Sequence, residues 1–460
     1  MPHEIYDAII IGGGAAGLAA ANELLDKKVL LLERDSRLGG RLHSYSEGDY
    51  WMNLGAHLFP GPDSYMGKLV TSLGLETIAI PGSKFAITFN GKVFTKNRVE
   101  SYPLTLPMTL RERVSFAIIG LKMLKTVADW RSTQNPNSGS HSSERSKKTT
   151  NRLAKTRFRD LLGTPSPRVD AIFSTAARRA SAELNEQSAG TGAALFGGVW
   201  AGKKSSLAYN LNGGSAKLAE ALAKRLGERV RLNTAVTAVY ESDSLVVVEA
   251  HHHGKRVSFR ARQVIVATSA DIAARIATGL PTEVLSCLSN VSYGAFVSMG
   301  VITSESGPQP IDPIYAITSP DCSFDMMFNH ANPLRTEGSR ADGGSLMVYS
   351  GGDLARTLLM SSDEAITELF VNDILKLYPQ LTGKIAKTRV QRWPIGLPFN
   401  RPGFSLHSVR QYCESGTNSI DLCGDYFGDL GNMEFAARSG IEAARRALAR
   451  IAAPTIQSMS

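Results

Sequence analysis

The chain has 460 residues, of which 43% are hydrophobic and 20% are charged. This composition excludes global disorder, and the length suits two or three domains or one core with a large insertion. The formal net charge of +9 raises nucleic acid or a membrane surface as partners.

The cysteines and the first residues bear on the compartment. The four cysteines lack the spacing of a zinc site, which favours free thiols in a reducing environment. Residues 1–7 lack a basic signal-peptide region, and the uncharged run 8–22 is too short to span a bilayer. We therefore expect a cytoplasmic protein that is at most peripheral to a membrane.

The first elements have the order of a dinucleotide-binding fold. Residues 7–11 form a continuous apolar run, which predicts a strand buried on both faces. The glycine-rich turn 12–17 follows, then an Ala- and Leu-rich helix over 18–25. A second apolar strand over 29–32 ends at Glu33.

The spacing of this motif has a physical reason. Gly12 permits a tight turn, Gly14 lets the backbone approach a pyrophosphate at the helix N-terminus, and Gly17 allows close helix packing. Glu33 follows at a distance where a carboxylate can accept hydrogen bonds from ribose hydroxyls. The motif predicts dinucleotide binding, and the alternative is a turn that only packs a helix.

Residues 108–130 are predicted to form an amphipathic helix, with an apolar face of Val114, Ala117, Ile118, Leu121, Leu124 and Ala128. We expect this face to pack into the core. The alternatives are a wall of an apolar substrate tunnel and a surface that lies on lipid.

The positive charge is concentrated directly after this helix. Residues 131–160 carry a net +6, while the other 430 residues carry only +3. The serines and the Asn-Pro-Asn-Ser-Gly stretch predict a flexible, solvated insertion over about 131–150. The overall charge therefore gives no reason to expect nucleic acid, and contact with acidic lipid or a partner stays open.

The middle of the chain alternates between helix and strand. Residues 213–226 predict a glycine entry and an amphipathic helix, and 229–240 predict a strand. A hairpin over 245–260 and a buried strand over 263–268 follow. His251, His252 and His253 fall at the hairpin tip, where a polar turn is favoured over a metal site, so we predict no metal.

The later elements include strands over 294–301, 314–319 and 345–349 and a helix over 361–376 that begins with an N-cap serine. The stretch 392–403 is rich in proline and aromatic residues. Its Trp393 and Phe399 would line a substrate pocket or belong to the core. A short strand then ends at Gly424 and Asp425, and a helix begins near Asn432.

Two motifs about 400 residues apart resemble the flavin amine oxidase, protoporphyrinogen oxidase and phytoene desaturase superfamily. The first comprises the glycine turn, Glu33, Gly39-Gly40-Arg41 and Gly55-Ala56-His57, and the second comprises Gly424, Asp425, Met433, Glu434, Ala436, Ser439 and Gly440. The resemblance implies an α/β fold. It has a Rossmann-like FAD-binding domain of the glutathione reductase type and an interleaved α+β substrate domain.

The resemblance also implies the domain bounds and the site. The FAD-binding domain would comprise 1–75, 205–280 and 405–455, and the substrate domain 76–204 and 281–404. The helix after Asp425 would direct its free N–H groups at the flavin. The residues expected at the cofactor are Gly12, Gly14, Ala15, Ala16, Gly17, Glu33, Arg34, Gly39, Gly40, Arg41, Leu54, Gly55, Ala56, His57, Val236, Ala267, Trp393, Gly424, Asp425, Asn432, Met433 and Ala436. His57 is the one catalytic candidate.

The sequence departs from many amine oxidases of this superfamily in three ways. Ser298 stands where they carry a lysine, and Asn432 stands where they carry an aromatic residue. No cysteine lies between 388 and 405 for a covalent flavin bond, so we expect non-covalent FAD. These departures favour the branch that oxidises larger, mostly apolar compounds.

The predicted function is an FAD-dependent oxidase or dehydrogenase that transfers hydride from a small, mostly apolar organic substrate to flavin N5, with oxygen or another acceptor. Three alternatives remain: a flavin amine oxidase, a redox-neutral mutase or isomerase, and a non-catalytic flavoprotein. A mutase would need arginines for a diphosphate, for which Arg335 and Arg356 are candidates. The sequence indicates no oligomeric state.

Overall fold

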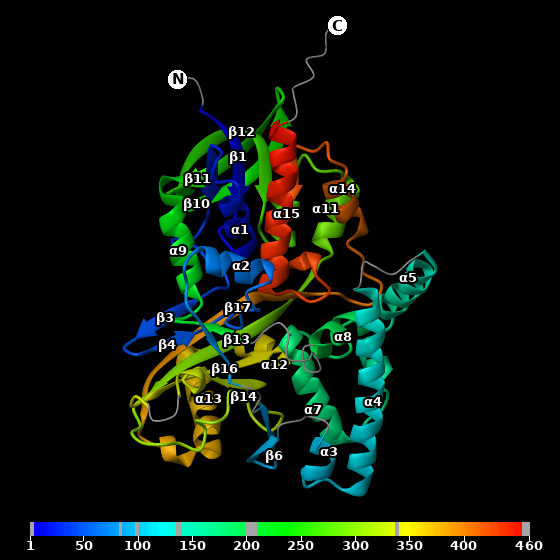
Figure 1. Cartoon of the computed structure of the whole chain (residues 1–460), viewed down its shortest axis with the longest axis vertical. Helices are drawn as coiled ribbons and strands as arrows, with labels where there is room; N and C mark the ends of the chain where they lie inside the picture. The colour runs from blue at the N-terminus through cyan, green and yellow to red at the C-terminus, as the bar shows by residue number, and fades with distance from the viewer. Residues whose placement is uncertain are drawn as a thin grey trace.

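The computed structural model describes residues 4–81, 85–96, 101–134, 140–197, 209–335 and 340–452. Two seven-stranded sheets organise this part of the chain, and a group of helices stands beside the second sheet (Figure 1). The α/β fold predicted from the sequence is confirmed.

The first sheet is built from segments at the start, middle and end of the chain. Its order is β10-β11-β12-β1-β2-β9, and β18 pairs with β12. The strands are β1 (Ile5–Ile11), β2 (Val29–Leu32), β9 (Val230–Arg231), β10 (Thr234–Ser242), β11 (Leu245–His252), β12 (Lys255–Val266) and β18 (Ile420–Leu422). The pairs β1–β2, β1–β12, β2–β9 and β12–β18 are parallel.

Helices cover both faces of the first sheet, which is why β1 is continuously apolar and buried from Ala8 to Ile11. Ile10 packs toward one face, while Ile9 and Ile11 pack toward the other. The helices α1 (Ala15–Glu23), α2 (Tyr65–Ser72), α9 (Ala216–Leu226) and α15 (Met433–Ala452) cover the first face, and α10 (Ala270–Ile276), α11 (Thr282–Ser289) and α14 (His407–Glu414) the second.

One predicted break in this region is absent. The hairpin arm ending at 260 and the strand predicted over 263–268 are a single strand, β12. Its first half pairs antiparallel with β11 and its second half pairs parallel with β1. The first half of β12 is exposed on one face, so its buried and exposed residues alternate. The second half ends in residues 264–266, which are covered on both faces and are therefore continuously apolar.

The second sheet has the order β17-β13-β16-β15-β14-β6-β7. Its strands are β6 (Phe85–Phe89), β7 (Lys92–Lys96), β13 (Ser292–Thr303), β14 (Ala316–Thr318), β15 (Met326–Asn329), β16 (Gly344–Gly351) and β17 (Ile385–Phe399). The helices α12 (Gly352–Leu358) and α13 (Asp363–Leu377) follow β16, and Ser362 caps α13 as predicted. The short pairs β3 (Ser44–Glu47) with β4 (Tyr50–Asn53), and β5 (Thr77–Ala79) with β8 (Tyr209–Leu211), complete the strands.

The helices beside the second sheet are α3 (Tyr102–Thr105), α4 (Leu110–Thr133), α5 (Ser140–Lys155), α6 (Phe158–Leu162), α7 (Pro167–Ala177) and α8 (Ala189–Gly197). A capping box between Thr109 and Glu112 begins α4. The face of α4 predicted to be buried is exposed instead, because a second row, Ile119, Met123 and Val127, packs against the neighbouring helices.

The prediction of a flexible loop over 131–150 is also wrong where the structure describes this stretch, because residues 140–155 form α5. This stretch contains no glycine or proline, and Leu153 is buried. An ion pair between Arg152 and Asp129 joins α5 to α4. The Asn-Pro-Asn-Ser-Gly stretch lies outside the described residues.

Candidate functional site

The glycine turn after β1 has the tight geometry predicted for it. Gly12 has a φ of +103°, and a β-carbon there would lie 2.9 Å from the carbonyl oxygen of Ala267. A β-carbon on Gly17 would overlap the carbonyl oxygen of Gly12. The backbone of Ala267 therefore lies directly against Gly12, and the carbonyl of Gly12 lies directly against Gly17. Positions 12 and 17 both require a residue without a side chain.

Gly14 differs from its neighbours because a β-carbon there would meet no atom within 4 Å. It is the N-cap of α1, where no side chain caps the helix and no acidic residue lies in the first turn. Free N–H groups at the positive end of a helix suit an anion, and the open space above Gly14 gives it room. These features fit the pyrophosphate of a dinucleotide, with Ala15 and Ala16 in the first turn.

Glu33 lies beside this turn. Its carboxylate accepts hydrogen bonds from the backbone N–H groups of Gly13 (2.6 Å) and Asp35 (2.8 Å). Burial raises its pKa, although these N–H groups lower it. The backbone N–H of Thr234 donates to the carbonyl of Glu33, which places the start of β10, and hence Val236, near the acid. Arg34 is exposed.

Four distant segments meet at Arg41. Its guanidinium donates to Asp425 (2.9 Å) and to the carbonyl of Gly396, and its own carbonyl accepts from Ala56. The backbone N–H of Gly39, two residues before Arg41, donates to the carbonyl of Gly13 in the glycine turn. The structure thus brings together the Gly-Gly-Arg segment, the Gly-Ala-His segment, the 392–403 stretch and the second motif at Asp425.

Trp393 contacts the Gly-Ala-His segment and the residue before it. Its indole N–H donates to the carbonyl of Leu54 at 2.8 Å and lies 3.2 Å from the hydroxyl of Ser298, which also donates to that carbonyl at 2.6 Å. A β-carbon on Gly55 would lie 3.3 Å from the Trp393 ring. Ser298 therefore fixes the loop before His57.

The closing helix α15 packs against α1. A β-carbon on Gly440 would overlap the carbonyl of Ala16, so the two helices touch through backbone. Asn432, which stands in place of an aromatic residue, caps α15 by accepting from the N–H of Phe435 at 3.0 Å. Met433 and Ala436 are buried in the same core as Ala16.

His57 lies in a buried aromatic group. Its Nδ1 lies 3.1 Å from the carbonyl oxygen of Gly55 and must donate to it, because a carbonyl only accepts. Burial lowers its pKa to about 4, so the ring is neutral at pH 7 and Nε2 carries a lone pair. Among the described residues Nε2 has no hydrogen-bond partner.

The residues around His57 come from the second sheet and the nearby β8. The rings of Phe328 and His330 lie 4.6 and 4.9 Å from the His57 ring, centroid to centroid. Asn210 donates to the carbonyl of His57 and to the hydroxyl of Tyr315. No pattern in the sequence indicates these neighbours, because they lie on strands or directly beside them, and these strands pack on His57 only in the folded chain.

The two arginines proposed for a diphosphate are already paired. Arg335 lies 3.5 Å from Asp312 and donates to the hydroxyl of Tyr50 and the carbonyl of Gly343. Arg356 pairs with Glu186 and Asp353. This pairing disfavours the mutase alternative.

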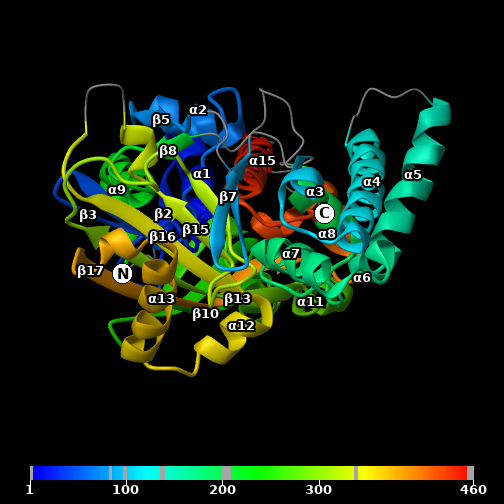
Figure 2. The same ribbon diagram turned by 90° about the horizontal axis from the view of Figure 1, so that it is seen from below.

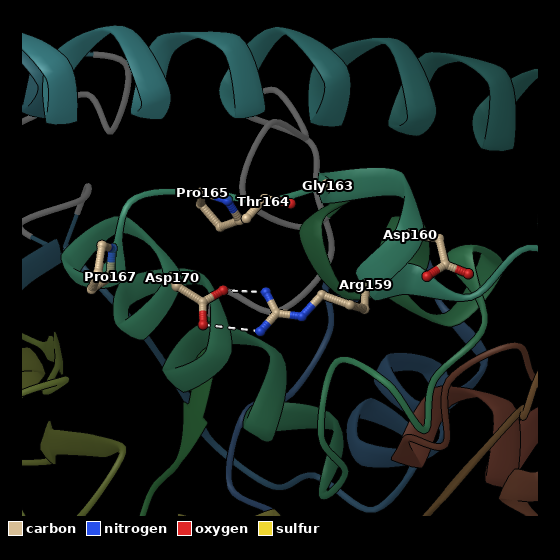
Figure 3. A pocket seen from close by; sticks show the side chains of 7 residues that line it. All are labelled: Arg159, Asp160, Gly163, Thr164, Pro165, Pro167 and Asp170. Carbon is tan, nitrogen blue, oxygen red and sulfur yellow. Dashed lines mark hydrogen bonds and ion pairs between the residues drawn. The ribbon is translucent and has the colours of Figure 1, made fainter.

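A surface pocket of about 740 Å³ lies elsewhere, between α6 and α7 (Figure 3). Arg159 and Asp170 form an ion pair within it. It contains none of the predicted site residues. The three histidines at 251–253 lie on the β11–β12 hairpin, and no metal-ligand group of three or more is found in the described ranges.

The model of the family described as flavin containing amine oxidoreductase matches residues 15–448. The chain belongs to this family. Membership confirms the predicted superfamily, the FAD cofactor and the oxidoreductase class. It also favours the amine oxidase alternative over the preferred protoporphyrinogen oxidase-like function.

The individual relatives match a smaller part of the chain than the family model does, or match it at low identity. A probable flavin-containing monoamine oxidase A of Dictyostelium discoideum is 34% identical over 91 residues, 19% of this chain and 20% of that protein. The flavin-containing amine oxidase A of Canis lupus familiaris is 26% identical over 331 residues, 64% of this chain and 55% of that protein. The chain spans about half or less of the length of the curated relatives it matches.

Among solved structures, the cyclohexylamine oxidase of Brevibacterium oxydans superposes with a TM-score of 0.76 at 19% identity. The match covers 97% of this chain and 99% of that one. At this identity the likeness shows the fold. No helix in the described ranges is long and apolar enough to cross a membrane.

Proposed function

We propose that this protein uses FAD to oxidise a carbon–nitrogen bond of a mostly apolar amine. The observation that carries the proposal is the neutral His57, with an unpartnered Nε2 among aromatic rings, next to the Gly55-Ala56 segment of the cofactor motif. The match to the amine oxidoreductase family supports the same class of substrate.

The first sheet and its helices are proposed as the FAD-binding domain, and the second sheet with its helices as the substrate domain. The N-terminus of α1, Glu33, Arg41 and Asp425 would hold the cofactor non-covalently. When bound, FAD supplies the hydride acceptor for the C–H bond next to nitrogen.

His57 is proposed to orient the substrate nitrogen. Its Nε2 can accept a hydrogen bond from an amine N–H, since Nδ1 is committed to Gly55. With a pKa of about 4, His57 is a weak base. It is therefore proposed to position the nitrogen and not to remove a proton from the amine. Phe328 and Tyr315 exclude water around it. Loss of hydride from the C–H bond next to nitrogen leaves an iminium ion, which releases its N–H proton to solvent to give the imine. Oxygen is proposed as the final acceptor of the two electrons and would leave as hydrogen peroxide.

The test is anaerobic bleaching of the bound flavin by primary and secondary amines, amino acids, polyenes and porphyrinogens. We expect bleaching by apolar amines. Bleaching by porphyrinogens or polyenes alone would refute the amine proposal and restore the other branch. Turnover without net electron transfer would identify a redox-neutral enzyme instead.

The variant His57→Phe tests the positioning role, because it keeps the ring and removes Nε2. We expect bound FAD to be retained while the KM for the amine rises at least about fivefold, the loss of roughly one hydrogen bond. His43→Phe is the matched control, because His43 is also buried with a lowered pKa but contacts Tyr45 and Trp393 instead. An unchanged KM in His57→Phe would refute the role.

A further inference from the structure

An exposed apolar row runs along the outer side of α4. Six of the ten large hydrophobic side chains exposed in the described ranges lie between 104 and 124. We define the α4 stripe as Leu110, Val114, Ile118, Leu121 and Leu124, whose side chains are 39–78% exposed. Their spacings of three and four residues place them on one face of the helix, over about 21 Å.

The opposite face of α4 already forms the core of the helical group. Ile119, Met123 and Val127 are at most 2% exposed and pack with Phe158 and Phe173. A helix that is apolar on two sides is normally buried on both. Figures 1 and 2 show α4 at the edge of the molecule, with α5 beside it.

The charges around the stripe are positive. Arg111 and Lys125 are exposed and have no carboxylate partner in the described part of the chain. The two acids of α4 are engaged, because Glu112 closes the capping box and Asp129 pairs with Arg152. On the neighbouring α5, Lys147 and Lys155 are also exposed.

We propose that the α4 stripe docks on an anionic lipid surface. An interfacial helix places its apolar side among the headgroups and uses Lys and Arg at its margins to bind acidic lipids. The positive charges beside the stripe favour anionic lipid over a second copy of the chain as the partner. Two copies joined through α4 would bring like charges together. The docking is independent of the proposed amine oxidation.

The test uses the full-length, FAD-loaded protein and sedimentation with vesicles of phosphatidylcholine, with or without phosphatidylserine. We expect binding only to vesicles that contain phosphatidylserine, weakened by added salt. The double variant Val114→Ser/Leu121→Ser should lower the bound fraction at least about tenfold, because two apolar side chains no longer enter the interface.

A charge variant, Arg111→Glu/Lys125→Glu, removes the cations without touching the apolar stripe, and we expect a similar loss. The matched control is Met360→Ser, an 89% exposed apolar residue after α12, which should bind as the wild type does. Wild-type protein that stays in solution with both vesicle types would overturn the proposal. So would vesicle binding that both double variants retain, or a wild-type dimer that the serine variant dissociates.

Discussion

Replacing Gly14 by alanine should separate flavin binding from folding. Gly14 has a φ of −75°, which alanine adopts without strain, and the added methyl group meets no protein atom within 4 Å. The stability of the flavin-free chain should change by less than about 1 kcal/mol, because the smaller freedom of alanine in the unfolded state is offset by its poorer fit at the N-cap of α1. The same methyl would enter the space proposed for the pyrophosphate. Overpacking of one methyl costs about 1–3 kcal/mol, so the Kd for FAD should rise about 5- to 150-fold.

The assay is titration of flavin-free protein with FAD, followed by fluorescence quenching, together with urea unfolding of the flavin-free form. Gly17→Ala is the contrasting variant, because its β-carbon would overlap the carbonyl of Gly12 and should destabilise the flavin-free chain itself. Wild-type FAD affinity in Gly14→Ala would refute the placement of the pyrophosphate over α1.

Three further outcomes are expected. Asp425→Asn removes the carboxylate that pairs with Arg41, so the purified protein should retain less FAD by absorbance. Thr109→Ala removes the cap of α4 and should lower the free energy of unfolding by about 1 kcal/mol in urea. Between pH 6.5 and 5 the unfolded chain protonates His57 and the folded chain does not. His57 alone should therefore account for a loss of roughly 1–2 kcal/mol of stability over this range, in addition to the losses from His43 and His330, whose pKa values burial also lowers. His57→Phe should lose less than the wild type by the amount that His57 contributes.

The local motifs were predictable because their chemistry lies within a few residues. The strand from 29 to 32, the glycine turn and the cap of α13 each depend on neighbours in sequence. The buried face of α4 was not predictable in this way. The helix has two apolar rows, and only packing against α6, α7 and α8 decides which row is buried.

By itself, the sequence predicted the dinucleotide fold, because backbone turns and helix termini are local structures, and the resemblance of its two motifs implied the FAD family and the residues expected at the cofactor. Only the tertiary structure placed Trp393 and Ser298 on the carbonyl of Leu54 and joined Arg41 to Asp425. It alone enclosed His57 with Phe328 and His330. These contacts join residues up to 384 positions apart, and such pairs leave no periodic trace in a single chain.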